Sequence, residues 1–318
     1  MVGDINLYGL RRVSPERVLN ALGLKTGDPL TVSRGELEDR VEEVSGVVQV
    51  WVQAVCCEGK RALLFVGIQE RGTPFLALRS EPAGDAVLPQ PILDLYRRFL
   101  EAVEAAARRG SNAEDLTNGH SLMADPAARA LQLQFVDYAA ANLANLREVL
   151  CGGSESEQRA IAASVIGYAP RKTDVVNDLQ YALQDPDEAV RANAIRSLTG
   201  VAVLAALHPE LEIRISPTWF VELLQSVVLS DRVKATDALV TLTERGGANV
   251  LDLLRERALP SLAEMARWKS LAYALPAYVL LGRVAGLPET EIHAEWEKGE
   301  RESVIARALG EPRRQKKR

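Results

Sequence analysis

The sequence predicts a mainly α-helical protein in two parts: an α+β module with the order βααββ, followed by an all-α domain of paired helices. Apolar residues alternate along three short segments within the first 70 residues, which is typical of strands. From about residue 126 they recur every three or four residues, which is typical of amphipathic helices. Aromatic residues make up only 5% of the chain, which favours packed helices over an all-β fold.

Length and composition predict a globular protein with about two domains. The chain has 318 residues, of which 47% are hydrophobic and 25% charged, so it can bury a sizeable core. We predict a module at 1–75, a linker and joining helix at 76–125, helical repeats at 126–310 and a basic tail at 311–318.

The first 75 residues show strand and helix signals in a fixed order. A short strand pattern at 5–9 precedes a helix that begins after Ser14, and a second helix begins after Ser33; serine is a preferred N-cap. Two alternating segments follow at 48–54 and 64–68, with turn residues between them, as expected for a hairpin. We therefore expect a three-stranded sheet with two helices.

This order of elements, with the turn and cap residues between them, resembles the POTRA domain. The matching positions are Ile5, Leu7, Gly9, Ser14, Glu16, Leu24, Gly27, Asp28, Pro29, Leu37, Gly46, Val47 and the strand end Val66-Gly67-Ile68-Gln69-Glu70. The resemblance implies a periplasmic or cell-envelope location and binding of extended peptide segments. POTRA proteins continue with further copies, a barrel or a membrane anchor, whereas this chain continues with helices, so transport and barrel assembly do not follow.

An edge strand of such a sheet is a candidate partner-binding site, because its unpaired N–H and C=O groups can pair with an extended peptide. The hairpin strand at 48–55 is our candidate if it lies at the edge. Its candidate residues are Val48, Val50, Trp51, Val52 and Gln53. Trp51 lies on the polar phase of the strand and should face away from the two helices. There it either anchors a partner or packs against the helical domain.

A polar loop at 111–123 holds Glu114, Asp115, His120 and Ser121. These residue types serve acyl transfer and metal binding, but their spacing fits no nucleophile elbow. The other interpretation is a structural loop whose polar side chains cap helix ends, as Asp125 does before the next helix.

We predict no catalytic, cofactor or metal site. The three cysteines stand at 56, 57 and 151 without a CxxC pair, which indicates neither a disulfide framework nor a metal site. One of Cys56 and Cys57 is expected to be a small core residue.

The segment from Asp185 to Leu198 is the strongest signal in the helical part. Asp185 is a predicted N-cap and Pro186 takes the first helical position, while Val190 begins an apolar face. This segment resembles a HEAT repeat, with weaker echoes at 157–162, 231–235 and 267–271 at intervals of about 32 to 44 residues. In HEAT repeats the aspartate and arginine bond to each other between neighbouring repeats, so the resemblance implies structural roles for Asp185 and Arg191. It also implies a curved stack with a concave protein-binding face.

We therefore predict a non-catalytic, protein-binding scaffold of the bacterial cell envelope, with a sheet edge for one partner and a helical surface for another. Its partners would be proteins, including extended peptide segments; no small-molecule substrate is expected, and nucleic acid is not favoured. No apolar run approaches the roughly 20 residues of a spanning helix, so an envelope location requires that a signal peptide has been removed.

Two alternatives remain open. One is a cytoplasmic adaptor whose tail, with five basic residues among 311–318, contacts nucleic acid or membrane; otherwise the tail is a solvated end. The other is a hydrolase that uses the loop at 111–123.

Overall fold

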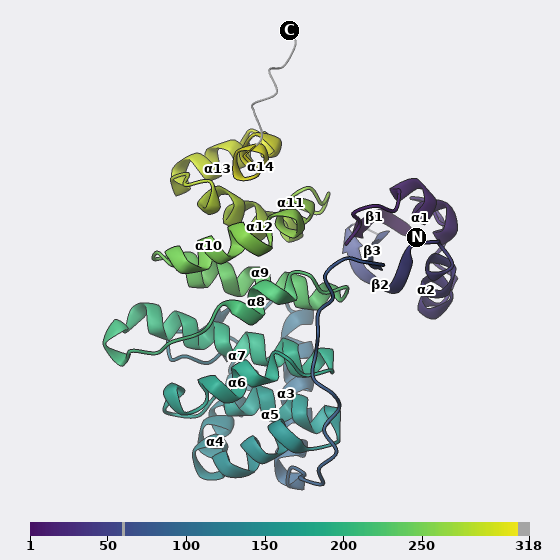
Figure 1. The fold of residues 1–318 in the computed structure, drawn as a ribbon. Coiled ribbons are helices and arrows are strands. Elements are labelled where there is room, and N and C mark those ends of the chain that lie inside the picture. The colour runs from purple at the N-terminus through teal and green to yellow at the C-terminus, as the bar shows by residue number, and fades with distance from the viewer. Residues whose placement is uncertain (59–60, 311–318) are drawn as a thin grey trace. The chain divides into compact units, whose positions relative to one another are not determined.

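The computed structural model describes residues 1–58 and 61–310 (Figure 1). It is mainly helical, with 58% helix and 11% strand. Two compact units are present: the first contains Met1–Leu76, Val221–Thr243 and the chain from Gly247 onward, and the second contains Ala77–Phe220 with Glu244–Gly246. The module expected at 1–75 thus lies in one unit, whereas the helices expected at 126–310 belong to both.

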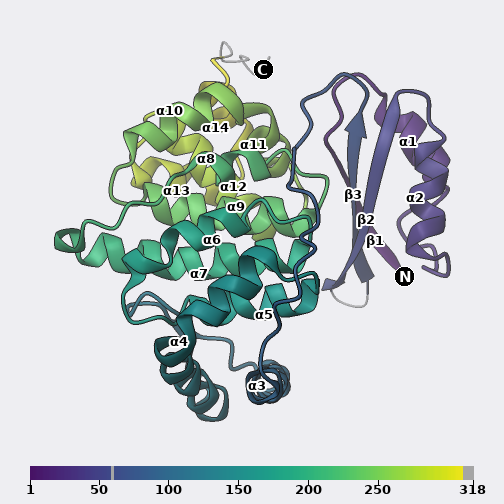
Figure 2. The same cartoon turned by 60° about the horizontal axis from the view of Figure 1, so that its bottom comes forward.

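A mixed three-stranded sheet lies at the N-terminus. Its elements follow the expected order β1 (Val2–Tyr8), α1 (Pro15–Leu22), α2 (Arg34–Glu42), β2 (Val47–Glu58) and β3 (Arg61–Glu70). The strand order is β1-β3-β2, with β1 parallel and β2 antiparallel to the central β3. Both helices cover one face of the sheet (Figure 2), so the predicted layout is confirmed.

Local signals explain the two helices. Ser33 accepts the amide of Glu36 and caps α2, as its position predicts. Gly23 ends α1 with a φ of 67°, a conformation that glycine adopts without strain. The apolar faces of the helices and the sheet then form one buried core, which includes Val18, Leu22, Leu37, Val41, Val50, Val52, Leu64 and Val66.

Residues from the C-terminal part of the first unit cover the opposite face of the sheet. Trp268 packs edge-on against Tyr8 and Phe65, with ring centroids 5.6 and 5.1 Å apart. At Gly67, a Cβ atom would lie 2.1 Å from the carbonyl oxygen of Val227, so a glycine is required for this close approach. The sheet is therefore buried on both faces.

Helices make up the rest of the first unit. They are α9 (Leu229–Thr243), α10 (Ala248–Arg257), α11 (Leu259–Ala266), α12 (Leu271–Val284), α13 (Glu289–Glu297) and α14 (Arg301–Ala308).

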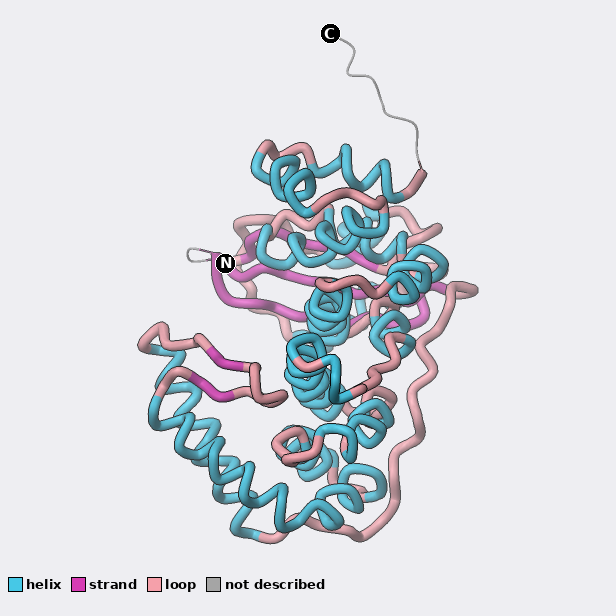
Figure 3. Tube along the Cα trace, turned by 90° about the vertical axis from the view of Figure 1, so that its left-hand side faces the viewer, coloured by secondary structure: helices cyan, strands magenta, loops and turns pink. Residues whose placement is uncertain are grey.

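The second unit holds five α-helices, two 3-10 turns and a short hairpin. The helices are α3 (Gln90–Arg108), α4 (Pro126–Gly152), α5 (Ser156–Ile166), α6 (Val176–Ala182) and α7 (Glu188–Leu207), and the turns are η1 (Lys172–Asp174) and η2 (Pro209–Leu211). The hairpin consists of β4 (Glu114–Asp115) and β5 (Leu122–Met123) (Figure 3). Helix α8 (Thr218–Leu223) crosses the boundary between the units. Asp125 caps α4 as predicted, by accepting two backbone amides.

The proline-rich segment before α3 runs along the second unit. The amide of Arg79 donates to the carbonyl of Gln184 over 2.8 Å, and that of Gly84 donates to Gly152 over 2.9 Å. The first part of the predicted linker is thus held to the helices by main-chain hydrogen bonds.

Buried arginines repeat at corresponding places in the helical sequence. Arg159, Arg191 and Arg232 each donate to a carbonyl oxygen six residues earlier in the chain. All three are among the largest fully buried side chains. Arg267, in the last of the three weaker echoes, instead pairs with Glu302 on the surface.

Asp185 contacts two of these buried arginines, and its ion pair joins two neighbouring repeat segments. Arg191 donates to the main-chain carbonyl of Asp185, whereas the carboxylate of Asp185 accepts two hydrogen bonds of 3.0 Å from Arg159. Arg159 lies 26 residues earlier, so this ion pair joins α5 to the turn before α7.

Helix α7 has 20 residues and, among the described residues, is the one helix long and apolar enough to cross a membrane. We had expected no apolar run of that length. Its residues Val190, Ala194 and Leu198 are buried, and it packs against α5 and α6. A buried core helix has the same composition, so this helix does not indicate a membrane location.

We expect Arg159→Met to lower the free energy of unfolding by about 3 kcal/mol, because it leaves the buried carboxylate of Asp185 without its main partner. Urea unfolding followed by circular dichroism measures the change. Arg97→Met is the matched control: it removes an exposed arginine paired with Asp94 and should change stability by less than about 0.5 kcal/mol. Equal effects of the two substitutions would contradict this role of Arg159.

Candidate functional site

The sheet has two edges, β1 and β2, and the β2 edge is covered by side chains of its own module. The amide of Val50 donates to Glu42 over 2.9 Å, and that of Val52 donates to Glu38 over 2.8 Å. Both carboxylates come from α2. Acidic side chains that occupy outward amides protect an edge against pairing with another chain.

The residues predicted to bind a partner on β2 are placed accordingly. Val50 and Val52 point into the core, and Val48 is 54% exposed. Trp51 and Gln53 are half-buried, and the guanidinium of Arg34 stacks 3.6 Å above the Trp51 ring. The strand lies at the edge as the prediction required, but two of its outward amides already have acceptors. Binding there remains a prediction that the structure does not test.

The outward main-chain groups in the middle of β1 are open. The amide of Gly9 donates to Glu264, away from β3, and residues two apart in a strand face the same edge. The register is regular from Ile5 onward, so Ile5 and Leu7 also face outward. No described residue outside the sheet forms a hydrogen bond with the main chain of either.

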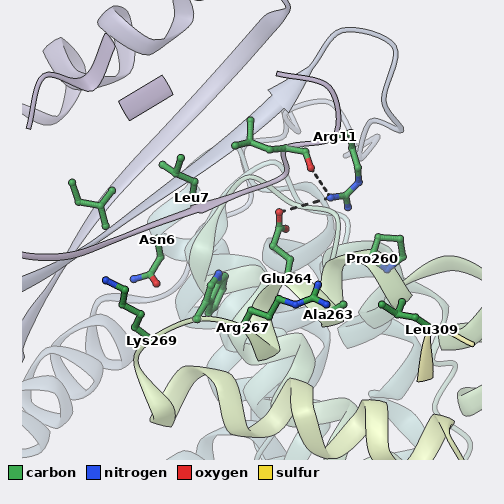
Figure 4. A pocket seen from close by; sticks show the side chains of 12 residues that line it. Asn6, Leu7, Arg11, Pro260, Ala263, Glu264, Arg267, Lys269 and Leu309 are labelled. Carbon is green, nitrogen blue, oxygen red and sulfur yellow. Dashed lines mark hydrogen bonds and ion pairs between the residues drawn. The ribbon is translucent and has the colours of Figure 1, made fainter. Parts of the chain in front are cut away.

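A cavity of about 590 Å³, which we call the β1 groove, lies along this edge. Its walls come from β1, from α11 and the turn that follows it, and from the end of α14 (Figure 4). The lining includes Ile5, Asn6, Leu7, Glu264, Trp268 and Lys269.

Glu264 fixes one end of the β1 groove. Its two carboxylate oxygens accept the amide of Gly9 at 2.9 and 3.0 Å, and one of them accepts from Arg232 at 3.2 Å. Arg11 lies 3.7 Å away. Arg232 is buried beneath the ring of Tyr8, 4.6 Å from its centroid. Burial lowers the pKa of Arg232, and the charge of Glu264 opposes that change.

Two buried donors in the groove have no acceptor among the described residues. They are Nδ2 of Asn6 and Nε1 of Trp268, and their side chains are only 6% and 4% exposed. A buried donor without an acceptor costs about 1–3 kcal/mol. A ligand that brings an oxygen acceptor into the groove would recover this free energy. Sequence analysis missed this site; a polar Asn6 inside an apolar strand was the available signal.

The charged side chains that line the groove are mostly basic. Arg11, Arg267 and Lys269 line it together with the single acidic residue Glu264. Lys269 pairs with Asp4 over 2.7 Å, and its side chain is 68% exposed. An exposed ion pair contributes about 1 kcal/mol or less, so Lys269 can change partners easily.

A second cavity, of about 530 Å³, shares Ile5 and Lys269 with the β1 groove. We call it the α1 cavity, because Leu19 and neighbouring residues of α1 line it, together with Leu24 and Lys25. The open part of β1 thus lies between two cavities that share residues.

The polar loop at 111–123 forms the β4–β5 hairpin, and the structure brings its serine and carboxylate together. Ser121 donates to Glu114, and Glu114 also accepts from Arg196. Gln132 in α4 donates to Ser121 over 3.3 Å. No histidine contacts Ser121 among the hydrogen bonds of the described residues, so these contacts tie the hairpin to the helices and assemble no serine–histidine pair.

His120 is held by Lys172 instead. Lys172 Nζ lies 3.0 Å from His120 Nδ1 and donates to the carbonyls of Gly167 and Ala169. Burial lowers the pKa of Lys172 to about 7, although its three acceptors suit an ammonium group. Burial and the charge of Lys172 lower the pKa of His120 to about 4, so His120 is neutral at pH 7.

Of the two adjacent cysteines, Cys56 is exposed and disulfide-bonded. The side chain of Cys57 lies outside the described residues, so the expectation that one of the two is a core residue stays a prediction. Cys151 is a free thiol whose pKa is raised by burial. The basic tail at 311–318 also lies outside the described residues.

Comparison with known proteins gives no match to a family model, to a curated protein or to a solved structure. The geometry of the site therefore carries the functional argument.

We expect Glu264→Gln to lower the free energy of unfolding by about 2 kcal/mol, because the buried guanidinium of Arg232 loses the carboxylate charge that it faces. Urea unfolding measures the effect. Glu302→Gln removes the carboxylate that pairs with exposed Arg267 and should change stability by less than about 0.5 kcal/mol. If Glu264→Gln were no more destabilising than this control, Glu264 would not fix β1 to α11.

His120 should make stability depend on pH. Its pKa falls from 6.5 to about 4 on folding, so between these values the unfolded chain binds more protons and stability is lost as the pH falls. The ring is part-exposed, and we expect a loss of about 1 kcal/mol after solvent screening. Urea unfolding at pH 7 and pH 4.5 should show a smaller pH-dependent loss for His120→Gln than for the unaltered protein. An identical loss in both would refute the assignment.

Proposed function

We propose that this protein is a non-catalytic binding scaffold of the bacterial cell envelope that takes up an extended peptide segment of a partner protein. The segment would add as a fourth strand beside β1. The observation that carries the proposal is the open main-chain edge at Ile5 and Leu7, which lies between the β1 groove and the α1 cavity.

Strand addition uses both features. Main-chain hydrogen bonds supply affinity, and pockets for alternate side chains supply specificity. Ile5 and Leu7 offer two N–H and two C=O groups. Successive side chains of an added strand point to opposite faces, so one would enter the β1 groove and the next the α1 cavity.

This proposal moves the expected site from β2 to β1. The outward amides of Val50 and Val52 are occupied by Glu42 and Glu38, and a peptide at β2 would have to displace both carboxylates. At β1 it would displace no hydrogen bond of Ile5 or Leu7.

The POTRA-like and HEAT-like classifications form part of the proposal. The sheet order with α1 and α2 on one face supports the first, together with the motifs at Ile5 and Gly67. The buried Arg159, Arg191 and Arg232, with their shared pattern of carbonyl contacts, support the second. Under this proposal the helical surface binds a further protein, and the envelope location depends on the POTRA resemblance.

We expect heptapeptides selected from a random phage-displayed library on the full chain to protect residues 4–8 from hydrogen–deuterium exchange, because an added strand covers those amides. Mass spectrometry of the exchanged protein, with and without a synthetic selected peptide, measures the protection. Peptides covering 47–56 report on β2 in the same experiment.

N-methylation of the peptide provides the matched control. Methyl groups on amides that face β1 should abolish binding, whereas methyl groups on the alternate amides should leave it intact. Protection of 47–56 instead of 4–8 would return the site to β2. Protection of neither segment, or no periodic effect of N-methylation, would refute strand addition.

A further inference from the structure

We infer that the β1 groove selects a carboxylate side chain, Glu or Asp, on the strand-adding peptide, and that the neighbouring peptide residues are apolar. This inference rests on the proposed strand addition and specifies the partner that it would recognise. Three observations carry it: the buried donors beside the groove, the charges around it and the three apolar side chains, Ile5, Leu19 and Leu24, that line part of the α1 cavity.

The buried donors define what the bound group must be. Asn6 and Trp268 both line the groove, and Asn6 Nδ2 and Trp268 Nε1 are buried beside it without an acceptor among the described residues. A carboxylate carries only acceptors, and its hydrogen bonds to N–H donors are stronger than those of a neutral carbonyl. An ammonium or guanidinium group brings only donors and would leave both nitrogens unsatisfied.

The charges favour a carboxylate over a neutral amide. Three basic residues, Arg11, Arg267 and Lys269, line the groove beside one acidic residue, Glu264. Each basic residue is paired with a carboxylate, of Glu264, Glu302 and Asp4 respectively, and Glu264 also accepts from Gly9 and Arg232. In Figure 4, the side chains of Lys269 and Asn6 lie close together. Lys269 is exposed and can release Asp4, its half-buried partner, to bind the carboxylate of the peptide instead.

The α1 cavity suits the residues on either side of that carboxylate. It is lined in part by Ile5, Leu19 and Leu24, and Leu19 is 37% exposed. Because adjacent side chains of a strand point to opposite faces, the sequence recognised at β1 is apolar–acidic–apolar.

The charge of the chain's own tail is opposite to the charge that we infer for the bound group. The sequence that follows Leu309, a lining residue, contains five basic residues among 311–318. These would meet Arg11, Arg267 and Lys269, which carry the same charge.

Three fluorescein-labelled probes test the inference on the full chain by fluorescence anisotropy. The first is acetyl-Thr-Thr-Leu-Glu-Val-Thr-Thr-amide, and the other two carry Gln or Lys in place of Glu. We expect the Gln peptide to bind about tenfold more weakly than the Glu peptide, which corresponds to one charge-assisted hydrogen bond. The Lys peptide should bind more weakly still.

Substitutions in the groove should remove the preference for Glu over Gln. Asn6→Leu, Trp268→Phe and Lys269→Met each remove one donor, and each should lower the tenfold ratio by at least threefold. Arg17→Met is the matched control, because it removes an exposed positive charge of the same module that does not line the groove. It should leave the ratio unchanged.

The melting temperature separates recognition from a structural role. Asn6→Leu removes a donor that has no acceptor, so the melting temperature of the free protein should stay equal or rise. A lower melting temperature together with equal weakening of all three peptides would assign Asn6 to folding and overturn its role in selection.

The outcomes also separate this inference from the proposed function. Equal binding of the three peptides with protection of residues 4–8 would overturn the carboxylate preference and leave strand addition standing. The same holds if none of the three binds while library-selected peptides without Asp or Glu do. If no peptide of either kind binds, both proposals fail. Tighter Glu-peptide binding after deletion of 311–318 would show that the tail occupies the groove, and would overturn the assignment.

Discussion

The carboxylate of Glu264 is the interaction on which the site depends. It holds the amide of Gly9 at the end of β1 and faces the buried guanidinium of Arg232, so it joins the sheet to α11 and α9 at once. This contact also sets where the open edge stops: beyond Leu7, the next outward amide is already bonded. The α11 wall of the β1 groove stays beside the strand because Glu264 holds both.

The two edge strands of the sheet differ in how their unpaired main-chain groups are satisfied. At β2, Glu38 and Glu42 satisfy amides within the strand. At β1, the ends are satisfied, by Asp28 at Val2 and by Glu264 at Gly9, while the middle stays open. Exposed edges invite pairing with other chains and are usually protected. The open part of β1 is short, and hydrogen bonds satisfy the strand at both ends. It can therefore pair with a few residues of a partner, but it is too short for extended strand pairing between whole chains.

The sequence was sufficient for features that depend on local pattern. The strands and the cap at Ser33 follow from periodicity and capping, and the structure has them. The predicted cap at Asp185 is wrong: α7 begins at Glu188, and Asp187 caps it by accepting the amides of Ala189 and Val190. Strand order depends on long-range pairing, so the sequence could not show that β3 is the central strand. It therefore could not show which strands form the two edges of the sheet. It also could not show that Trp268 and Glu264 meet β1, since more than 250 residues separate Gly9 from Glu264. The groove exists only through that contact.

A buried donor without an acceptor indicates a ligand site only where its side chain also lines a cavity. Trp51 also has a buried Nε1 atom without an acceptor among the described residues, but the guanidinium of Arg34 covers its ring, and Trp51 lines neither the β1 groove nor the α1 cavity. Asn6 and Trp268 differ because both line the same groove. Each unsatisfied donor costs about 1–3 kcal/mol, a large share of a typical stability of about 5–15 kcal/mol. Leucine and phenylalanine would avoid that cost, so a bound acceptor is the physical reason we assign to both side chains.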